Sequence, residues 1–265
     1  MDIAAIREAV LQTIVAVAPE IDAQQIRPQQ PLRRQIDLDS IDWLNVLAGL
    51  QERLSIAIPD EDAGRLGTLD AIVAYLAARQ AQPAARPADR RAPAATGLPS
   101  GQHLIGGQAI TVRPIRPDDL RREADFFRHL SQETRYKRFL VTVSELSEAK
   151  LHYFTEVDQV RHVALGATVD RDGEAALVGV ARYIVAPDGG SCEFAIAVDD
   201  DWQGSGLAGI LMRTLIDVAR SRGLATMEGT VLATNVRMLK FSRQLGFIQQ
   251  RDPDDRETVR IVRRL

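Results

Sequence analysis

The chain has 265 residues, more than one small domain needs, and 45% of them are apolar, which is enough for a sizeable core. Its net charge of −3 argues against nucleic acid as the main partner. A single cysteine, Cys192, excludes an internal disulfide, and the four scattered histidines form no cluster with metal-ligand spacing. No stretch reads as a signal peptide or a membrane span, so we expect a cytoplasmic protein with no metal and no membrane partner.

The first 79 residues have the apolar spacing of helices. Apolar residues recur three or four positions apart, which lets each segment bury one face. The positions that define three predicted helices are Ile3, Ile6, Val10, Ile14 and Val17; Ile41, Leu44, Leu47 and Leu54; and Leu69, Ile72, Val73 and Leu76. A short turn is expected at residues 60–66. With twelve acidic and seven basic residues, this piece has a net charge of −5.

Residues 80–103 are expected to form a flexible linker. The segment holds four prolines and many alanines, and it has neither an aromatic residue nor an apolar periodicity. Such a composition favours an extended tether. An ordered surface loop is the alternative, but a loop of this length is uncommon inside a compact domain. We therefore predict two domains, at residues 1–79 and 104–265.

Residues 104–265 alternate between predicted strands and helices, with turn signals between several strands. The strands are expected at 109–115, 163–169, 176–185, 192–198, 227–232 and 258–262, and the helices at 118–130, 145–154, 206–222 and 236–245. The turn sequences Asp170–Gly173 and Pro187–Gly190 each join two strands directly, which indicates hairpins. The predicted fold class of this domain is therefore α+β with a largely antiparallel sheet.

The run Asp39-Ser40-Ile41-Asp42 opens the second predicted helix. This run resembles the acyl carrier protein family around its modified serine, and the resemblance continues through residues 44–76. It implies a four-helix bundle with 4′-phosphopantetheine on Ser40, attached by a phosphopantetheinyl transferase. A phosphodiester there would lie beside the free N–H groups of a helix start. Ser40 as a simple helix cap is the alternative. Asn45 and Gln51 stand where the family often has acids that dock partner enzymes.

A glycine-rich loop, Gln203–Ala208, follows one predicted strand and precedes a helix. Glycines let the backbone turn sharply and approach a ligand closely. Successive N–H groups, together with the positive end of a helix, then suit a phosphate. The alternative is a tight strand-to-helix connection without a ligand.

The pattern Gln-x-x-Gly-x-Ala in this loop resembles the pyrophosphate-binding motif of the GNAT superfamily of acetyltransferases. A helix that starts at Asn235 and ends in Gln244–Phe247 is similar to the superfamily's second motif. The resemblance implies a splayed, mixed and mainly antiparallel sheet with helices on both faces, which binds acetyl-CoA or another acyl-CoA. The implied cofactor-binding residues are Ala197, Val198, Gln203, Gly204, Ser205, Gly206, Leu207, Ala208 and Asn235.

Three segments resemble, within this superfamily, the bacterial Pat-type protein lysine acetyltransferases. They cover residues 113–140, 179–190 and 193–212. The resemblance implies an amine acceptor, and it suggests that residues 135–139 form part of the acceptor wall.

Acyl transfer to an amine needs a proton acceptor and a donor for the developing oxyanion. By resemblance, Glu193 would be the base and the N–H of Val198 the oxyanion donor, while Ser242 stands where many members have a tyrosine acid. A solvated outer-face position is the alternative for Glu193. Tyr183 is a second candidate acid or else a core aromatic. Cys192, next to Glu193 on the strand, should point to the opposite face and be structural.

Three functions remain open at this stage. The first is an N-acetyltransferase that acts on a protein lysine or a small amine. The second is a carrier-linked acyltransferase whose acceptor or acyl donor hangs from Ser40, which the tether would hold at roughly millimolar concentration. The third is a non-enzymatic module that senses acyl-CoA and docks a partner.

Overall fold

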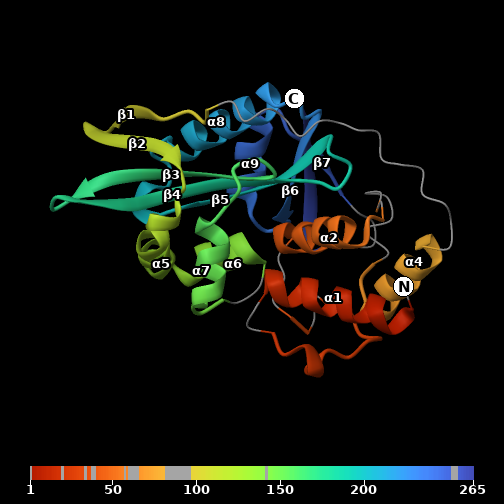
Figure 1. Cartoon of the computed structure of the whole chain (residues 1–265). Helices are drawn as coiled ribbons and strands as arrows, with labels where there is room; N and C mark the ends of the chain where they lie inside the picture. Colours follow the sequence, from red (N-terminus) through yellow and green to blue (C-terminus); the bar gives the residue numbers. More distant parts are fainter. Residues whose placement is uncertain are drawn as a thin grey trace. The chain divides into compact units, whose positions relative to one another are not determined.

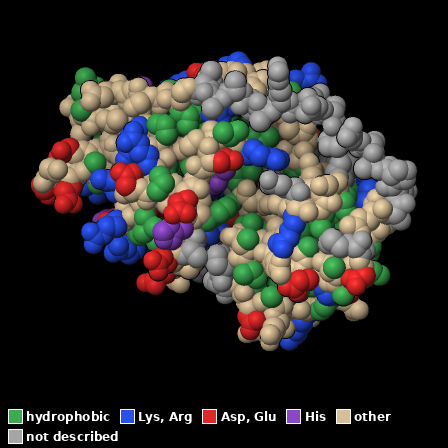
Figure 2. Space-filling model, viewed as in Figure 1, with side chains coloured by type: hydrophobic (Ala, Val, Ile, Leu, Met, Phe, Trp, Pro, Cys, Tyr) green, Lys and Arg blue, Asp and Glu red, His purple; other side chains and the backbone are tan. Residues whose placement is uncertain are grey.

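The computed structural model describes residues 2–18, 21–32, 35–36, 40–56, 58, 66–80, 97–140, 143–251 and 256–265. The chain forms two compact units, one containing Met1–Arg91 and Ala186–Gly189 and the other Ala92–Val185 and Gly190–Leu265 (Figure 1). Three predicted features lie outside the described residues, namely Asp39, most of the 60–66 turn and residues 81–96 of the linker. Acidic and basic side chains are interspersed on the face that Figure 2 shows, in keeping with the small net charge.

The N-terminal unit is helical, as predicted. It contains α1 (Ile3–Val17), the 3₁₀ turn η1 (Ala23–Gln25), α2 (Ser40–Leu54) and α4 (Leu69–Gln80). Asp2 caps α1, since its carboxylate accepts a 2.7 Å hydrogen bond from the Ala5 amide. The apolar stripes of the three helices meet in one core, whose fully buried members include Ile6, Val10, Ile14, Val46, Leu47, Leu50, Ile72 and Leu76.

The C-terminal unit is built on one sheet with the strand order β1-β2-β3-β4-β5-β6-β8-β7. The neighbours pair antiparallel except β5 and β6, which are parallel. The strands are β1 (Gly101–Ile105), β2 (Gln108–Pro114), β3 (His162–Arg171), β4 (Glu174–Val185), β5 (Ser191–Val198), β6 (Thr226–Leu232), β7 (Ile248–Gln250) and β8 (Thr258–Arg264). The mixed, mainly antiparallel sheet is thus confirmed.

Helices cover both faces of this sheet, as the predicted fold requires (Figure 1). The helical segments are η3 (Pro117–Asp119), α5 (Leu120–His129), α6 (Gln132–Phe139), α7 (Glu148–Thr155), η4 (Asp200–Trp202), α8 (Leu207–Ser221) and α9 (Val236–Gln244). Leu211 and Leu215 of α8 pack on one face of β3 and β4. Phe126 and Leu130, in and just after α5, pack with Val180 on the other face.

Three elements differ from the prediction. Residues 101–103, predicted as the end of the linker, belong to β1, which pairs with β2 across a turn at Gly106 and Gly107. Helix α6 and strand β7 were not predicted. Within the described residues, no helix has the length and apolarity to span a membrane, and no group of His, Cys, Asp and Glu side chains has the arrangement of a metal site.

Candidate active site

The sheet splits between its two parallel strands. β5 and β6 pair only through Ser191, Cys192 and Glu193, which lie opposite Thr226, Met227 and Glu228. Beyond Glu193, the remainder of β5 stays paired to β4, while the remainder of β6 stays paired to β8. The split therefore leaves one edge of β5 open in the middle of the sheet, starting at the predicted base.

The backbone of β5 determines which residues face this open edge. Residues that exchange hydrogen bonds alternate along an antiparallel pair. Because the Asp199 amide donates to the Val178 carbonyl of β4 at 3.0 Å, Ala197 also directs its backbone groups toward β4. Val198 directs its N–H and C=O toward the open edge. Of the two predicted residues, only Val198 has a backbone placed to pair with an arm in the split.

The predicted phosphate loop lies at the end of the split. Gly204 and Gly206 have φ angles of +80° and +97°, a region that L-residues rarely adopt. Gly206 is the N-cap of the 15-residue helix α8, and a β-carbon there would meet no atom within 4 Å. The first-turn amides of this helix have no intrahelical acceptor, and the helix dipole favours an anion at this end. The loop therefore has the geometry of a phosphate cradle.

The other predicted binding residues form hydrogen bonds within the protein or pack in its core. The Ser205 hydroxyl donates to the Trp202 carbonyl at 2.6 Å, and it accepts from the Leu207 amide. Leu207 is fully buried and Ala208 partly buried against the α8 core. Asn235 caps α9 by accepting a 3.1 Å bond from the Met238 amide.

Two arginines that were not predicted as binding residues lie beside this loop. Arg237, in the first turn of α9, donates from Nη1 to Gln203 Oε1 at 3.4 Å, and its Nη2 lies next to Gly204. Arg213 of α8 lies over Gly209 in the first turn of the same helix. Arg237 thus brings positive charge beside the loop, and Arg213 brings it beside the first turn of α8.

Glu193 lies on β5 on the opposite face of the sheet from α8. It pairs across the sheet with Ile184 of β4, and only 8% of its surface is exposed. The Thr230 hydroxyl of β6 donates to its Oε1 at 3.3 Å. This burial excludes the solvated outer-face alternative and places the carboxylate at the start of the split.

Two candidate proton donors do not fit that role. Ser242 is 1% exposed, and its hydroxyl donates to the Leu239 carbonyl within α9 at 3.0 Å, so the structure does not present it to a leaving thiolate. Tyr183 is fully buried in the α8 core, and burial raises its pKa to about 12. Cys192 is buried in the same core, on the face opposite Glu193, which confirms its structural role.

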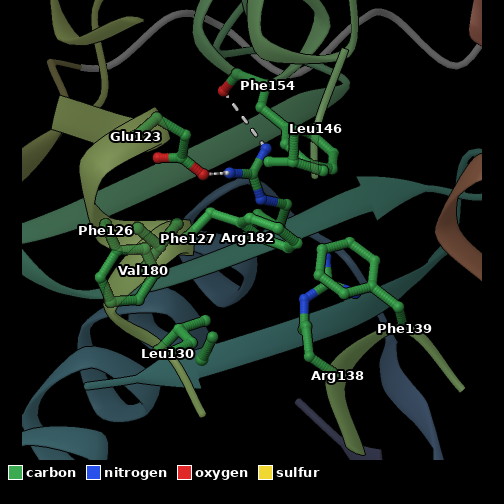
Figure 3. A pocket seen from close by; sticks show the side chains of 11 residues that line it. Glu123, Phe126, Phe127, Leu130, Arg138, Phe139, Leu146, Phe154, Val180 and Arg182 are labelled. Atoms are coloured by element: carbon green, nitrogen blue, oxygen red, sulfur yellow. Dashed lines mark hydrogen bonds and ion pairs between the residues drawn. The ribbon is translucent and has the colours of Figure 1, made fainter. Parts of the chain in front are cut away.

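A small pocket lies under the Glu193 face of the sheet (Figure 3). Its floor includes Val180 of β4 and Ala197 of β5, and its walls come from α5, α6, α7 and the segment before α7. Arg138 and Phe139 of α6, from the segment 135–139 predicted as part of an acceptor wall, line this pocket. The volume is about 20 Å³, enough for about one water molecule. A longer side chain can therefore enter only if a wall residue moves.

A buried ion pair, Arg182 with Glu123, lines this pocket, and no sequence motif pointed to it. Arg182 of β4 donates to Glu123 Oε1 of α5 at 3.0 Å and to the Phe154 carbonyl of α7 at 3.2 Å (Figure 3). Burial raises the pKa of Glu123. Burial, followed by the charge of Arg182, lowers the pKa of His162 well below its usual value. A lone arginine among apolar residues of a central strand was the one available signal.

The C-terminal unit is similar to known acetyltransferases. A sequence profile described as "Acetyltransferase (GNAT) family" matches residues 124–247. "Acetyltransferase PA5475" of Pseudomonas aeruginosa is 40% identical over 164 residues, which are 62% of this chain and 87% of that protein. This chain belongs to the GNAT family of acetyltransferases. Membership of this family implies the use of an acyl-CoA.

The GNAT domain is also similar to Pat proteins. The solved structure titled "Crystal Structure of the GNAT domain of S. lividans PAT" superimposes with a TM-score of 0.58 at 30% identity, and the match covers 63% of this chain and 97% of that one. "Acetyltransferase Pat" of Mycolicibacterium smegmatis is 31% identical over 147 residues, which are 55% of this chain and 43% of that protein. The predicted resemblance is thus confirmed. Membership of this family identifies the chain as an acyltransferase and excludes the non-enzymatic alternative.

The N-terminal unit of this GNAT protein matches a second family. A profile described as "Phosphopantetheine attachment site" covers residues 9–76. "Acyl carrier protein" of Helicobacter hepaticus is 30% identical over 70 residues, which are 26% of this chain and 92% of that protein. In the structure, helix α2 begins at Ser40. The chain therefore joins a carrier domain to a GNAT acetyltransferase domain.

Proposed function

We propose that the GNAT domain transfers an acetyl group from acetyl-CoA to a primary amine, either a protein lysine or a small molecule. The observation that carries the proposal is the split of the sheet at Glu193. It combines a buried carboxylate, the open edge of Val198 and the glycine loop that starts at Gln203. These three features are what acyl transfer from a CoA thioester requires.

Each group has a definite role in this mechanism. The loop and the first turn of α8 hold the pyrophosphate of the acyl-CoA, with Arg237 beside it. Glu193 removes a proton from the acceptor's ammonium, or from a water that relays it, so that a neutral amine attacks the thioester carbonyl. The Val198 amide donates to the oxyanion that forms. The attacking nitrogen, now positively charged, loses its second proton to solvent. When the intermediate collapses, the C–S bond breaks, the CoA thiolate leaves and takes a proton from solvent, and the neutral amide product remains.

The experiment is a pair of measurements on the full-length protein and its Glu193→Gln variant. We expect the variant to bind CoA with unchanged affinity in calorimetry. Its turnover with acetyl-CoA and a panel of lysine peptides and small amines should fall by about 10² to 10⁴, the usual effect of losing a general base. Equal turnover by the two proteins would contradict the assignment of Glu193.

The carrier domain supports a second candidate, in which the acceptor or the acyl donor is tethered to phosphopantetheine on Ser40. The observation that favours it is the match of residues 9–76 to a phosphopantetheine attachment family in the same chain as the transferase. We propose the domain limits 1–79 and about 101–265, with the linker between them. A tether of that kind raises the local concentration of its cargo to about millimolar, so that a weak acceptor site suffices.

Two measurements separate the candidates. The first is the intact mass after incubation with CoA and a broad-specificity phosphopantetheinyl transferase, with Ser40→Ala as the control. A mass increase by one phosphopantetheine group in the wild-type protein, but not in Ser40→Ala, establishes the modification. The second is the turnover of Ser40→Ala with free amines. Unchanged turnover supports a free acceptor, whereas loss of turnover supports the tethered one.

A further inference from the structure

The carboxylate of Asp200 connects the acyl-CoA loop to the acceptor side of the sheet. Asp200 follows β5 directly, in the 3₁₀ turn η4. Its oxygens accept hydrogen bonds from the Ser131 amide at 2.8 Å, the Ser131 hydroxyl at 2.9 Å and the Thr134 hydroxyl at 2.7 Å. These donors are 66 and 69 residues distant in sequence. Burial would raise the pKa of Asp200, but the bonds from Ser131 and Thr134 outweigh it, and the pKa is lowered.

These bonds fix the start of helix α6. Ser131 is the N-cap of α6, and its hydroxyl also accepts from the Thr134 amide at 3.2 Å. A carboxylate beside a helix start is favourable because of the helix dipole. The other end of the same helix contributes Arg138 and Phe139 to the wall of the pocket. The position of Asp200 therefore sets the position of one pocket wall.

The Gln203 side chain extends this network into the acyl-CoA site. Its amide nitrogen lies within hydrogen-bond distance of Thr134 Oγ1 at 3.1 Å, Asp200 Oδ1 at 3.2 Å and the Val198 carbonyl at 3.3 Å. Its oxygen accepts from Arg237. One side chain thus contacts the open edge of β5, an arginine beside the phosphate loop and the first turn of α6. Any ligand that takes a bond from Gln203 changes the bonds left to Thr134 and Asp200.

We propose that Asp200 is a positioning residue that couples acyl-CoA binding to the acceptor pocket through the first turn of α6. The inference rests on the proposed function, which assigns the loop to acyl-CoA, and it adds that the pocket lined by Arg138 and Phe139 receives the amine. Acyl-CoA in the loop orients Gln203 and thereby stabilises the hydrogen bonds that Asp200 accepts from Ser131 and Thr134. Helix α6, with Arg138 and Phe139, is then held in the position that accepts the amine. By thermodynamic linkage, a bound amine raises the affinity for acyl-CoA by the same factor by which acyl-CoA raises the affinity for the amine.

The experiment is hydrogen–deuterium exchange of the full-length protein with and without saturating CoA, read on peptides that cover residues 131–140. This readout needs no knowledge of the acceptor. We expect CoA to slow exchange in α6 of the wild-type protein by about five- to tenfold, the lower range of typical couplings. In Asp200→Asn, the slowing in α6 should disappear while CoA still protects the first turn of α8. Asp201→Asn removes the same charge one residue away and should behave as the wild type does.

The outcomes are distinguishable. If CoA does not bind the wild-type protein, the proposed function fails. If CoA binds and protects α8 but leaves α6 unchanged, the coupling is refuted and the proposed function stands. If Asp200→Asn keeps the CoA-dependent protection of α6, Asp200 is not the coupling residue. A purely structural role would speed exchange in α6 equally with and without CoA, and this result would also overturn the proposal.

Discussion

Replacing Gly206 by alanine tests the phosphate loop through its backbone alone. The φ angle of Gly206 is +97°, and a β-carbon there would meet no atom within 4 Å. No steric overlap is expected, so the whole effect comes from the left-handed backbone, which costs an L-residue about 1–2 kcal/mol. This cost appears in one of two places. If the loop keeps its shape, the free energy of unfolding falls by that amount. If the loop relaxes, CoA must restore it, and the dissociation constant rises by about 5- to 30-fold.

The assay combines calorimetric titration with CoA and denaturant unfolding of the same preparation. Gly107→Ala is the matched control, because Gly107 has a φ angle of +84° and equal free space in the β1–β2 turn. It should lower the free energy of unfolding similarly and leave CoA affinity unchanged. For Gly206→Ala, the two losses should together amount to about 1–2 kcal/mol. Wild-type stability together with wild-type affinity would refute the assignment of a left-handed glycine to the phosphate cradle.

Three further predictions follow from particular contacts. Arg237→Gln should weaken CoA binding and reduce its dependence on salt, measured by titration at several ionic strengths, because one cation beside the loop is lost. Asp119 is fully buried. Burial is the largest single effect and would raise its pKa, but the bonds and charge of Arg113, the Arg116 amide and the Arg122 bond together outweigh it, and the pKa is lowered. Its contribution to stability is therefore present above the unfolded pKa of about 4 and is lost as the pH falls further. Asp119→Asn should be less stable at neutral pH by about 3 kcal/mol, with a smaller loss in acid, in denaturant unfolding at each pH. Gly229→Ala should lower the free energy of unfolding by about 1–3 kcal/mol, because a β-carbon would lie 2.9 Å from the Phe194 ring.

The strands and helices that bury a full apolar stripe were predictable from sequence, and the elements that do not were missed. Helix α6 has one buried residue, Phe139, so it has no stripe to detect. Its start is fixed by Ser131 and by Asp200, and the latter contact joins residues far apart in sequence. Strand β1 alternates weakly and follows the proline-rich segment, which extended the predicted linker by three residues.

In the candidate site, likewise, local features were predictable from the sequence and contacts between distant residues were not. The turn made by the loop glycines was predictable because their neighbours in sequence determine it, whereas Glu193 was assigned from the resemblance to the superfamily. Ser242 was assigned by motif position, but a serine hydroxyl within a helix readily bonds to a carbonyl of the preceding turn, as it does here with Leu239. Arg182 and Glu123 are 59 residues apart, and only the packing of α5 on β4 brings them together.

The open edge of β5 also has a consequence for solubility. Residues 194–198, Phe-Ala-Ile-Ala-Val, are uncharged, apolar and suited to strands, which is the composition of segments that add to foreign sheets. Because this strand edge is unpaired, its free N–H and C=O groups can pair with a strand of another molecule. The Gln203 amide on the Val198 carbonyl occupies part of this edge, and the Phe194 ring lies against Gly229 across the split. We expect this contact of Gln203, at the start of the proposed acyl-CoA loop, to reduce self-association through the open edge.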